Sequence, residues 1–204
     1  MRFLIVGAGG FAKEVADCLD LLGHVVVGFF DEAGARTHEP TGLPVVDSLD
    51  ALDYEAATVA IGFPHARRRL FEEVSARAEV PEIVHPSASV SPHATVGAGA
   101  VLMQNVVVSA DASVGRNTIL NVGVYVAHDA RVGTDCHIAP ATQVSGWSRV
   151  GDGCILGTGT IVLPSRLIGD RCSIGAGTIV NRDVPDGYLA YGVPVRLIRE
   201  VEAP

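Results

Sequence analysis

Aliphatic residues recur at every sixth position through the second part of the chain, from Val84 to Val180. All seventeen of these positions hold Val, Leu or Ile. The residue two places before each of them is mostly Ala, Ser, Thr or Cys. This six-residue period is typical of a parallel β-helix, whose stacked coils bury one continuous apolar column. We therefore predict a β-helix of hexapeptide repeats with a C-terminal cap over residues 81–204.

A second period of 18 residues indicates that three hexapeptides form one triangular coil. Glycines follow an inward aliphatic residue at Gly97, Gly115, Gly133, Gly151 and Gly169. We interpret them as one corner of the triangle, where a tight turn favours a residue without a Cβ. Three of the four cysteines share this spacing, and no CxxC pair is present. We expect Cys136, Cys154 and Cys172 to stack as reduced, inward-pointing thiols.

The outward positions of the predicted coils differ between the three sides. Two sides are largely apolar and the third is mostly polar, which predicts that the apolar sides form an interface between copies of the chain. The apolar ladders are Val101, Ile119, His137, Ile155, Ser173 and Val107, Tyr125, Gln143, Ile161, Ile179, and the polar one is Thr95, Ser113, Arg131, Arg149, Leu167.

Residues 1–80 follow a different pattern, in which short apolar runs alternate with segments of helical period. We expect a small Rossmann-like α/β domain, with residues 33–48 as a loop containing one small extra strand. The expected strands are "RFLIVGAG" (2–9), "HVVVGFFDE" (24–32) and "TVAIG" (58–62), and the expected helices are "FAKEVADCLDLLG" (11–23) and "PHARRRLFEEVSARA" (64–78).

The glycine loop "GAGGFA", residues 7–12, lies between the first strand and the first helix, and Asp31 ends the second strand. This pattern is that of a dinucleotide-binding loop, whose backbone amides attract phosphate. The α/β pattern ends near residue 80, however, and half of a dinucleotide fold suits a single nucleotide. A nucleotide-linked substrate is favoured over a nicotinamide dinucleotide, while a close-packed turn without ligand is a third interpretation.

Composition narrows the class of protein. The 204 residues carry a formal net charge of −8, which argues against a nucleic-acid or anionic-membrane surface. No apolar run is long enough to span a bilayer, and the N-terminus does not have the pattern of a signal peptide. We therefore expect a cytoplasmic protein without a nucleic-acid partner, a membrane span or a metal site.

The stretch "GVYVAHDARVG", residues 123–133, carries the candidate chemistry. His128 and Asp129 fall at a predicted turn and are either a solvated surface pair or a general base with an orienting acid. His137 interrupts an otherwise apolar ladder, where a histidine without a partner would be costly. The two histidines are half a coil apart and therefore lie on different sides of one subunit, so a shared site requires a neighbouring subunit.

The whole chain resembles the bacterial sugar acetyltransferases that join a small Rossmann-like domain to a left-handed β-helix. The family includes sialic-acid O-acetyltransferase-like proteins and nucleotide 4-amino-sugar N-acetyltransferases. The resemblance is carried by "GAGGFAKEV", "NVGVYVAHDARVG", "HIAPATQVSG" and "IVNRDVPDGYLAYGVPVRLI". It implies a homotrimer that uses acetyl-CoA as co-substrate and needs no metal.

The resemblance also implies roles for individual residues. His128 would be the general base and Asp129 the acid that raises its basicity, and a backbone N–H near Gly146 would stabilise the oxyanion. Acetyl-CoA would contact His137, Gly146, Gly157, Thr158 and Ala176. The nucleotide-linked sugar would contact Gly9, Gly10, Phe11, Asp31, Glu32, Gly62 and Asn121.

The predicted activity is acetyl transfer from acetyl-CoA to the amino group of a nucleotide-linked amino sugar, by direct attack. Two alternatives remain open. One is O-acetylation of a sugar hydroxyl at the same site, and the other is a non-catalytic β-helix that serves as a binding or scaffold protein.

Overall fold

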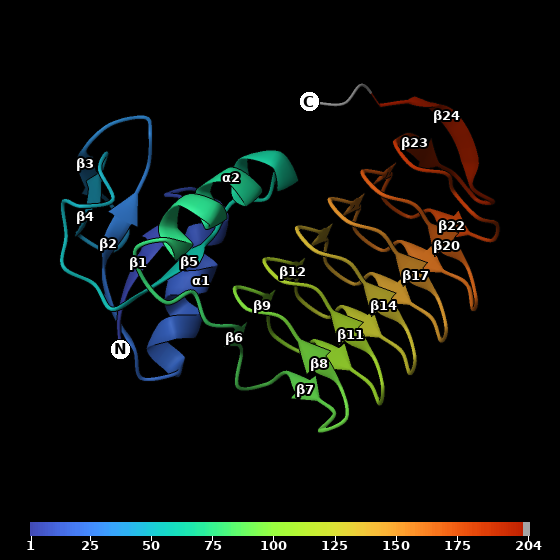
Figure 1. The fold of residues 1–204 in the computed structure, drawn as a ribbon, viewed down its shortest axis with the longest axis horizontal. Coiled ribbons are helices and arrows are strands. Elements are labelled where there is room, and N and C mark those ends of the chain that lie inside the picture. The colour runs from blue at the N-terminus through green and yellow to red at the C-terminus, as the bar shows by residue number, and fades with distance from the viewer. Residues whose placement is uncertain (202–204) are drawn as a thin grey trace.

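The computed structural model describes residues 1–201 and contains an α/β part beside the first coils of a long β-helix (Figure 1). The α/β part is a five-stranded sheet of order β3-β4-β2-β1-β5, parallel except for β3 against β4. Its elements are β1 (Arg2–Val6), α1 (Gly10–Leu21), β2 (Val25–Phe30), β3 (Arg36–His38), β4 (Leu43–Val46), β5 (Ala56–Val59) and α2 (Pro64–Ser75).

The buried residues of these elements follow from the sequence pattern. Phe3 to Val6 of β1 are fully buried, as expected for a central parallel strand covered on both sides. Helix α2 buries positions 67, 70, 71 and 74, which share one face at helical spacing. The expectation of one extra strand in residues 33–48 was wrong, because β3 and β4 pair there as an antiparallel hairpin.

The β-helix has three faces of parallel two-residue strands (Figure 1). The first face is β6 (Ile83–Val84), β9 (Val101–Leu102), β12 (Ile119–Leu120), β15 (His137–Ile138), β18 (Ile155–Leu156) and β21 (Ser173–Ile174), extended by the cap strands β23 (Tyr188–Tyr191) and β24 (Arg196–Glu200). The second is β7 (Ser89–Val90), β10 (Val107–Val108), β13 (Tyr125–Val126), β16 (Gln143–Val144), β19 (Ile161–Val162) and β22 (Ile179–Val180). The third is β8 (Thr95–Val96), β11 (Ser113–Val114), β14 (Arg131–Val132), β17 (Arg149–Val150) and β20 (Leu167–Ile168).

The small inward residues do more than fill space. The Cys136 thiol donates to the Gly151 carbonyl at 3.0 Å, and the Thr118 hydroxyl donates to the Gly133 carbonyl at 2.7 Å. Small donors at these positions therefore satisfy backbone carbonyls of the next coil. All four cysteines are free and buried, and Cys136, Cys154 and Cys172 belong to the apolar column of the β-helix, as expected for inward-pointing side chains.

The glycines at 18-residue spacing lie at one corner of the coils, as expected, since each follows a strand of the third face, but the reason given for them was wrong. Between Val96 and Ile174 the residue three places after each inward aliphatic residue has the left-handed conformation. The glycines at 18-residue spacing, here called the ladder glycines, do not adopt it. Instead they allow close stacking of coils. A Cβ on Gly97 would lie 2.5 Å from the Arg116 nitrogen, and one on Gly151 would collide with the Asp170 carboxylate.

The assignment of both apolar ladders to contacts between copies also needs correction. Val101 and Ile119 on the first face are fully buried within one chain, in a cluster with β1 and α1 residues. The chain's own α/β part thus covers the early coils of this face, because it folds back beside them (Figure 1). The second face keeps its outward apolar residues: Tyr125 is 38% exposed, and Ile161 and Ile179 are half-buried.

Candidate active site

The glycine loop borders a pocket of about 340 Å³ at the carboxyl ends of the parallel strands. Helix α1 begins beside this pocket at Gly10, and no side chain caps its first N–H groups. Such a helix start attracts phosphate. Six of the seven predicted sugar-nucleotide residues line the pocket: Gly9, Gly10, Phe11, Asp31, Glu32 and Gly62.

The two acids of the pocket are already paired. Asp31 accepts from the Ala33 N–H at 2.9 Å and binds Arg36 at 2.7 Å. Burial acts to raise the pKa of Asp31, but these two partners outweigh it, and the pKa is lowered. Glu32 binds Arg69 at 2.7 Å. Both groups are therefore acceptors for ligand hydroxyl or N–H groups and would repel phosphate.

Gly62 joins the pocket to His137 on the first face of the β-helix. Its carbonyl accepts from His137 Nδ1 and from the Arg67 guanidinium, each at 2.9 Å. A Cβ on Gly62 would lie 3.0 Å from His137 Nδ1, so only glycine permits this approach without displacement. The pocket and the histidine, far apart in sequence, are thus one connected structure.

The chemical state of His137 follows from these contacts. Burial lowers the pKa of His137, the Gly62 hydrogen bond partly opposes this, and the Arg67 charge adds to the lowering. The ring is therefore neutral near pH 7, with the proton on Nδ1, because a carbonyl can only accept. Its Nε2 has no hydrogen-bond partner among residues 1–201, which leaves an acceptor available to a ligand.

His128 and Asp129 form a hydrogen-bonded pair at the corner between the second and third faces. His128 Nδ1 and Asp129 Oδ2 are 2.9 Å apart, and the His128 side chain is 50% exposed. Asp129 occupies the left-handed position of the turn, with φ of 60°. The carboxylate thereby fixes the tautomer that leaves Nε2 free as a proton acceptor.

The next coil places Gly146 and Trp147 against this histidine. A Cβ on Gly146 would lie 2.8 Å from His128 Cε1, so the ring rests on the glycine backbone. The Trp147 ring meets the imidazole edge to face, with centroids 4.7 Å apart. Within residues 1–201 the Gly146 N–H has no hydrogen-bond acceptor. A donor beside a base is the arrangement that an oxyanion site requires.

The remaining predicted residues lie at another corner. Asn121, Gly157, Thr158 and Ala176 all follow strands of the first face, at its junction with the second. Thr158 and Ala176 are exposed, and a Cβ on Gly157 would touch the Ala176 nitrogen at 2.5 Å. Within one chain the structure therefore forms three groups, and it does not bring this corner or the His128 corner to the glycine-loop pocket.

Two residues escaped the sequence analysis. Arg67 is fully buried, and its guanidinium donates to the carbonyls of Ile61, Gly62, Asn117 and Asp135. Its position on the buried face of α2 is a signal that could have found it. Trp147 could have been found from the 18-residue period, which stacks it on Asp129. His65 lines a separate cleft of about 480 Å³ with Phe63 and Arg171.

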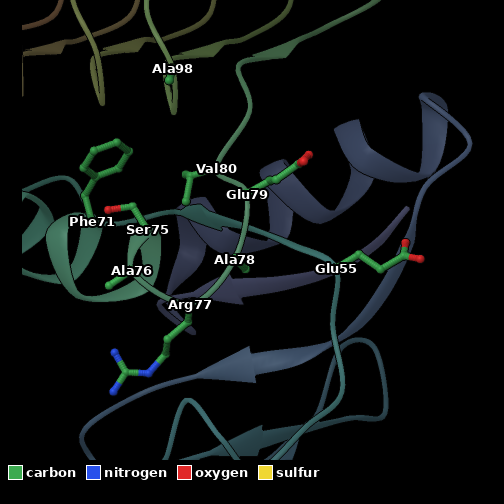
Figure 2. Close-up of a pocket in the computed structure, with 9 residues that line it drawn as sticks. All are labelled: Glu55, Phe71, Ser75, Ala76, Arg77, Ala78, Glu79, Val80 and Ala98. Carbon is green, nitrogen blue, oxygen red and sulfur yellow. The ribbon is translucent and has the colours of Figure 1, made fainter.

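A further hollow lies away from all of these residues. It has a volume of about 690 Å³ and is bordered by the end of α2, residues 76–80 and Ala98 of the β-helix (Figure 2). It contains none of the predicted site residues. Within residues 1–201 no helix is long and apolar enough to cross a membrane, and no three His, Cys, Asp or Glu side chains are placed to hold a metal ion.

Comparison with known proteins gives the class of protein. The family model of the PglD N-terminal domain matches residues 2–74. A variant of perosamine N-acetyltransferase from Caulobacter crescentus, solved with CoA and GDP-perosamine, is 35% identical, with a TM-score of 0.93 and 98% of each chain covered. The acetyltransferase domain of PglB from Neisseria gonorrhoeae, solved with acetyl coenzyme A, is 31% identical, with a TM-score of 0.89 and coverage of 97% of this chain and 98% of that chain.

WeeI from Acinetobacter baumannii shares the fold at 24% identity, with a TM-score of 0.89 over 97% of this chain and 100% of that chain. No sequence among the curated proteins matches. The fold and the full-length similarity define an acetyltransferase of the β-helix class. More narrowly, the chain belongs to the family of sugar acetyltransferases that join a PglD-type N-terminal domain to a β-helix.

Proposed function

We propose that this protein transfers the acetyl group of acetyl-CoA to the amino group of a nucleotide-linked amino sugar. The observation that carries the proposal is the exposed His128–Asp129 hydrogen bond of 2.9 Å, in a chain that matches a perosamine N-acetyltransferase over 98% of its length. Two solved structures of that relative carry a substitution of a single histidine, by asparagine or by alanine. Because acetyl-CoA is a cytoplasmic metabolite, we place the reaction in the cytoplasm.

The mechanism is a direct acyl transfer. The sugar amine attacks the thioester carbonyl, and His128 Nε2 accepts a proton from the attacking nitrogen. Asp129 holds the ring and favours the imidazolium that forms. The C–S bond then breaks, and the imidazolium returns the proton to the leaving thiolate of CoA. The Gly146 N–H is the donor placed to stabilise the intermediate oxyanion.

The two substrates are assigned to different parts of the chain. Residues 1–80 hold the nucleotide-linked sugar, with its phosphates at the glycine loop and α1 N-terminus and its other polar groups near Asp31 and Glu32. Residues 81–204 form the acyltransferase part. Acetyl-CoA lies along Gly157, Thr158 and Ala176 and reaches His137, while Asn121 lies at the same corner to contact the sugar.

A homotrimer completes this site. His128 is at one corner of the β-helix, whereas the pocket adjoins His137 on the first face, so one chain does not bring base and acceptor together. A neighbouring copy packed against the second face would supply the base. The outward apolar residues Tyr125, Ile161 and Ile179 support that contact.

Release of free thiol from acetyl-CoA, measured with a panel of nucleotide-linked sugars, tests the function. We expect turnover with 4-amino sugars and none with the matching 4-hydroxy sugars. Turnover with hydroxy sugars alone would instead establish the O-acetyltransferase. Absence of turnover with the whole panel, together with binding of nucleotide sugar, would favour a non-catalytic binding protein.

Replacement of Gly9 by valine should raise the KM for the sugar nucleotide at least roughly tenfold, because the side chain would block backbone approach to phosphate. The substitution tests binding cleanly, since a Cβ on Gly9 meets nothing within 4 Å and φ is −88°. Steady-state kinetics of Asp17→Val, an exposed position on the same helix, provide the control. A raised KM for acetyl-CoA instead would reverse the assignment of the two ligands.

Ile161→Asp should dissociate the assembly, because it places an unpaired charge in the contact between subunits. The matched control is Leu167→Asp, the same type of change on the third face, where Leu167 is 47% exposed. Sedimentation velocity should give a trimer for the parent and for Leu167→Asp, and a monomer for Ile161→Asp. An active monomeric parent would contradict both the trimer and the shared site.

A further inference from the structure

We propose that Trp147 is a positioning residue that holds the His128 imidazole in its reactive orientation. The inference rests on the proposed role of His128 as general base. It assigns a function to a side chain that the motif leaves out, and it concerns the orientation of Nε2, the atom that accepts the proton.

The contact between the two rings is specific. Their centroids are 4.7 Å apart and the planes meet at 85°, the edge-to-face geometry that aromatic pairs prefer. The backbones are also linked, because the Trp147 N–H donates to the His128 carbonyl at 3.3 Å. Asp129 binds Nδ1, the ring lies so close to Gly146 that a Cβ there would collide with it, and Trp147 packs against the ring. Three neighbours thus fix the imidazole while Nε2 stays free.

The tryptophan stands out at its position in the fold. It occupies the left-handed place of the turn, with φ of 57°, where bulky side chains are rare. The residue is 60% exposed, so the indole gains little stabilisation from burial at this place. At the equivalent turns of the neighbouring coils this place is held by Asp111, Asp129 and Ser165. The one large aromatic ring of this column thus lies one coil from the proposed base.

An exposed histidine needs such support. Half of the His128 side chain is open to solvent, and a hydrogen bond to Asp129 alone leaves the ring free to swing about Nδ1. Displacement of a reacting group by about 1 Å can cost on the order of 100-fold in rate. A rigid ring packed against the imidazole removes that freedom.

The kinetic test compares Trp147→Ala with Trp147→Phe. The alanine variant should lose roughly 10- to 100-fold in kcat, with the KM of both substrates changed by less than about threefold, because orientation and not binding is lost. The phenylalanine variant keeps an aromatic ring and should recover most of kcat. Sedimentation should give the same mass for both variants as for the parent.

Fluorescence gives an independent readout, because Trp147 is the only tryptophan in the chain. An adjacent imidazole changes the emission of an indole, so the emission of Trp147 should differ between the parent and His128→Ala measured at the same pH.

The outcomes separate this inference from the proposed function. Full activity in His128→Ala would defeat the general base and the inference with it. If kcat falls as expected in His128→Ala but is retained in Trp147→Ala, the inference about Trp147 is overturned and the proposed function is not. A loss in Trp147→Ala that accompanies a changed assembly mass would also overturn it, since Trp147 would then serve a contact between subunits. Trp147 emission that is the same in the parent and in His128→Ala would show that the two rings are not in contact.

Discussion

Replacement of His128 by alanine is expected to lower kcat by roughly 10²- to 10⁴-fold, the usual contribution of a general base. The proposed proton acceptor is Nε2 of His128, whose ring lies against Gly146. Binding of the nucleotide-linked sugar should change little, because its predicted contacts lie elsewhere, and of the predicted acetyl-CoA contacts only Gly146 adjoins His128. Steady-state kinetics with both substrates varied would measure the two effects separately.

The fold should survive this substitution, which makes the kinetic result interpretable. His128 lies at a turn and is half exposed, and the inward residue of its coil is Val126. Thermal unfolding of the variant should therefore match the parent. Asp129→Asn should cost less in kcat, since the amide still contacts Nδ1. A loss below about threefold in a well-folded His128→Ala variant would make the histidine a bystander.

The β-helix was predictable because its rule is local and repeated. Each inward aliphatic residue, from Val84 to Val180, marks one side of a coil, and the strand pairs join residues 18 apart throughout. Most α/β elements were predictable from their local periodicity, but the β3–β4 hairpin was not. The packing of the α/β part on the β-helix could not be predicted. The periodicity shows that Val101 and Ile119 point outward, but it does not indicate whether the chain's own α/β part or a second copy covers them.

The candidate site also contains some features that could be predicted from the sequence and others that could not. The glycine loop, Asp31 and Gly62 could be grouped from sequence, because parallel strands place their carboxyl ends at one edge. The His137–Gly62 contact could not, since it depends on how the α/β part docks on the first face. The reason for the ladder glycines was also missed, because close stacking of coils and a left-handed turn both favour glycine, and only φ distinguishes them.

Arg67→Met is expected to destabilise the folded chain by about 3 kcal/mol or more, because buried carbonyls that lose their donor cost about 1–3 kcal/mol each. Arg67 is fully buried and bridges the two parts of the chain: it binds Ile61 and Gly62 in the loop after β5, and Asn117 and Asp135 in the β-helix. Burial lowers the pKa of Arg67 to about 10, so the guanidinium remains charged at pH 7.

Methionine keeps the unbranched apolar part of the side chain but supplies no donor, so most of the loss reflects the hydrogen bonds and only a small part the space left by the guanidinium. The matched control is Arg68→Met, the next residue on α2, whose side chain is 62% exposed. Its cost should stay within about 0.5 kcal/mol, as for other surface changes. Urea denaturation at one fixed protein concentration would compare the variants, because assembly adds to apparent stability. An equal loss of unfolding free energy in both variants would show that Arg67 does not tie the two parts together. We expect the loss in Arg67→Met alone, together with a raised KM for the sugar nucleotide, because the loop that contains Gly62 is released.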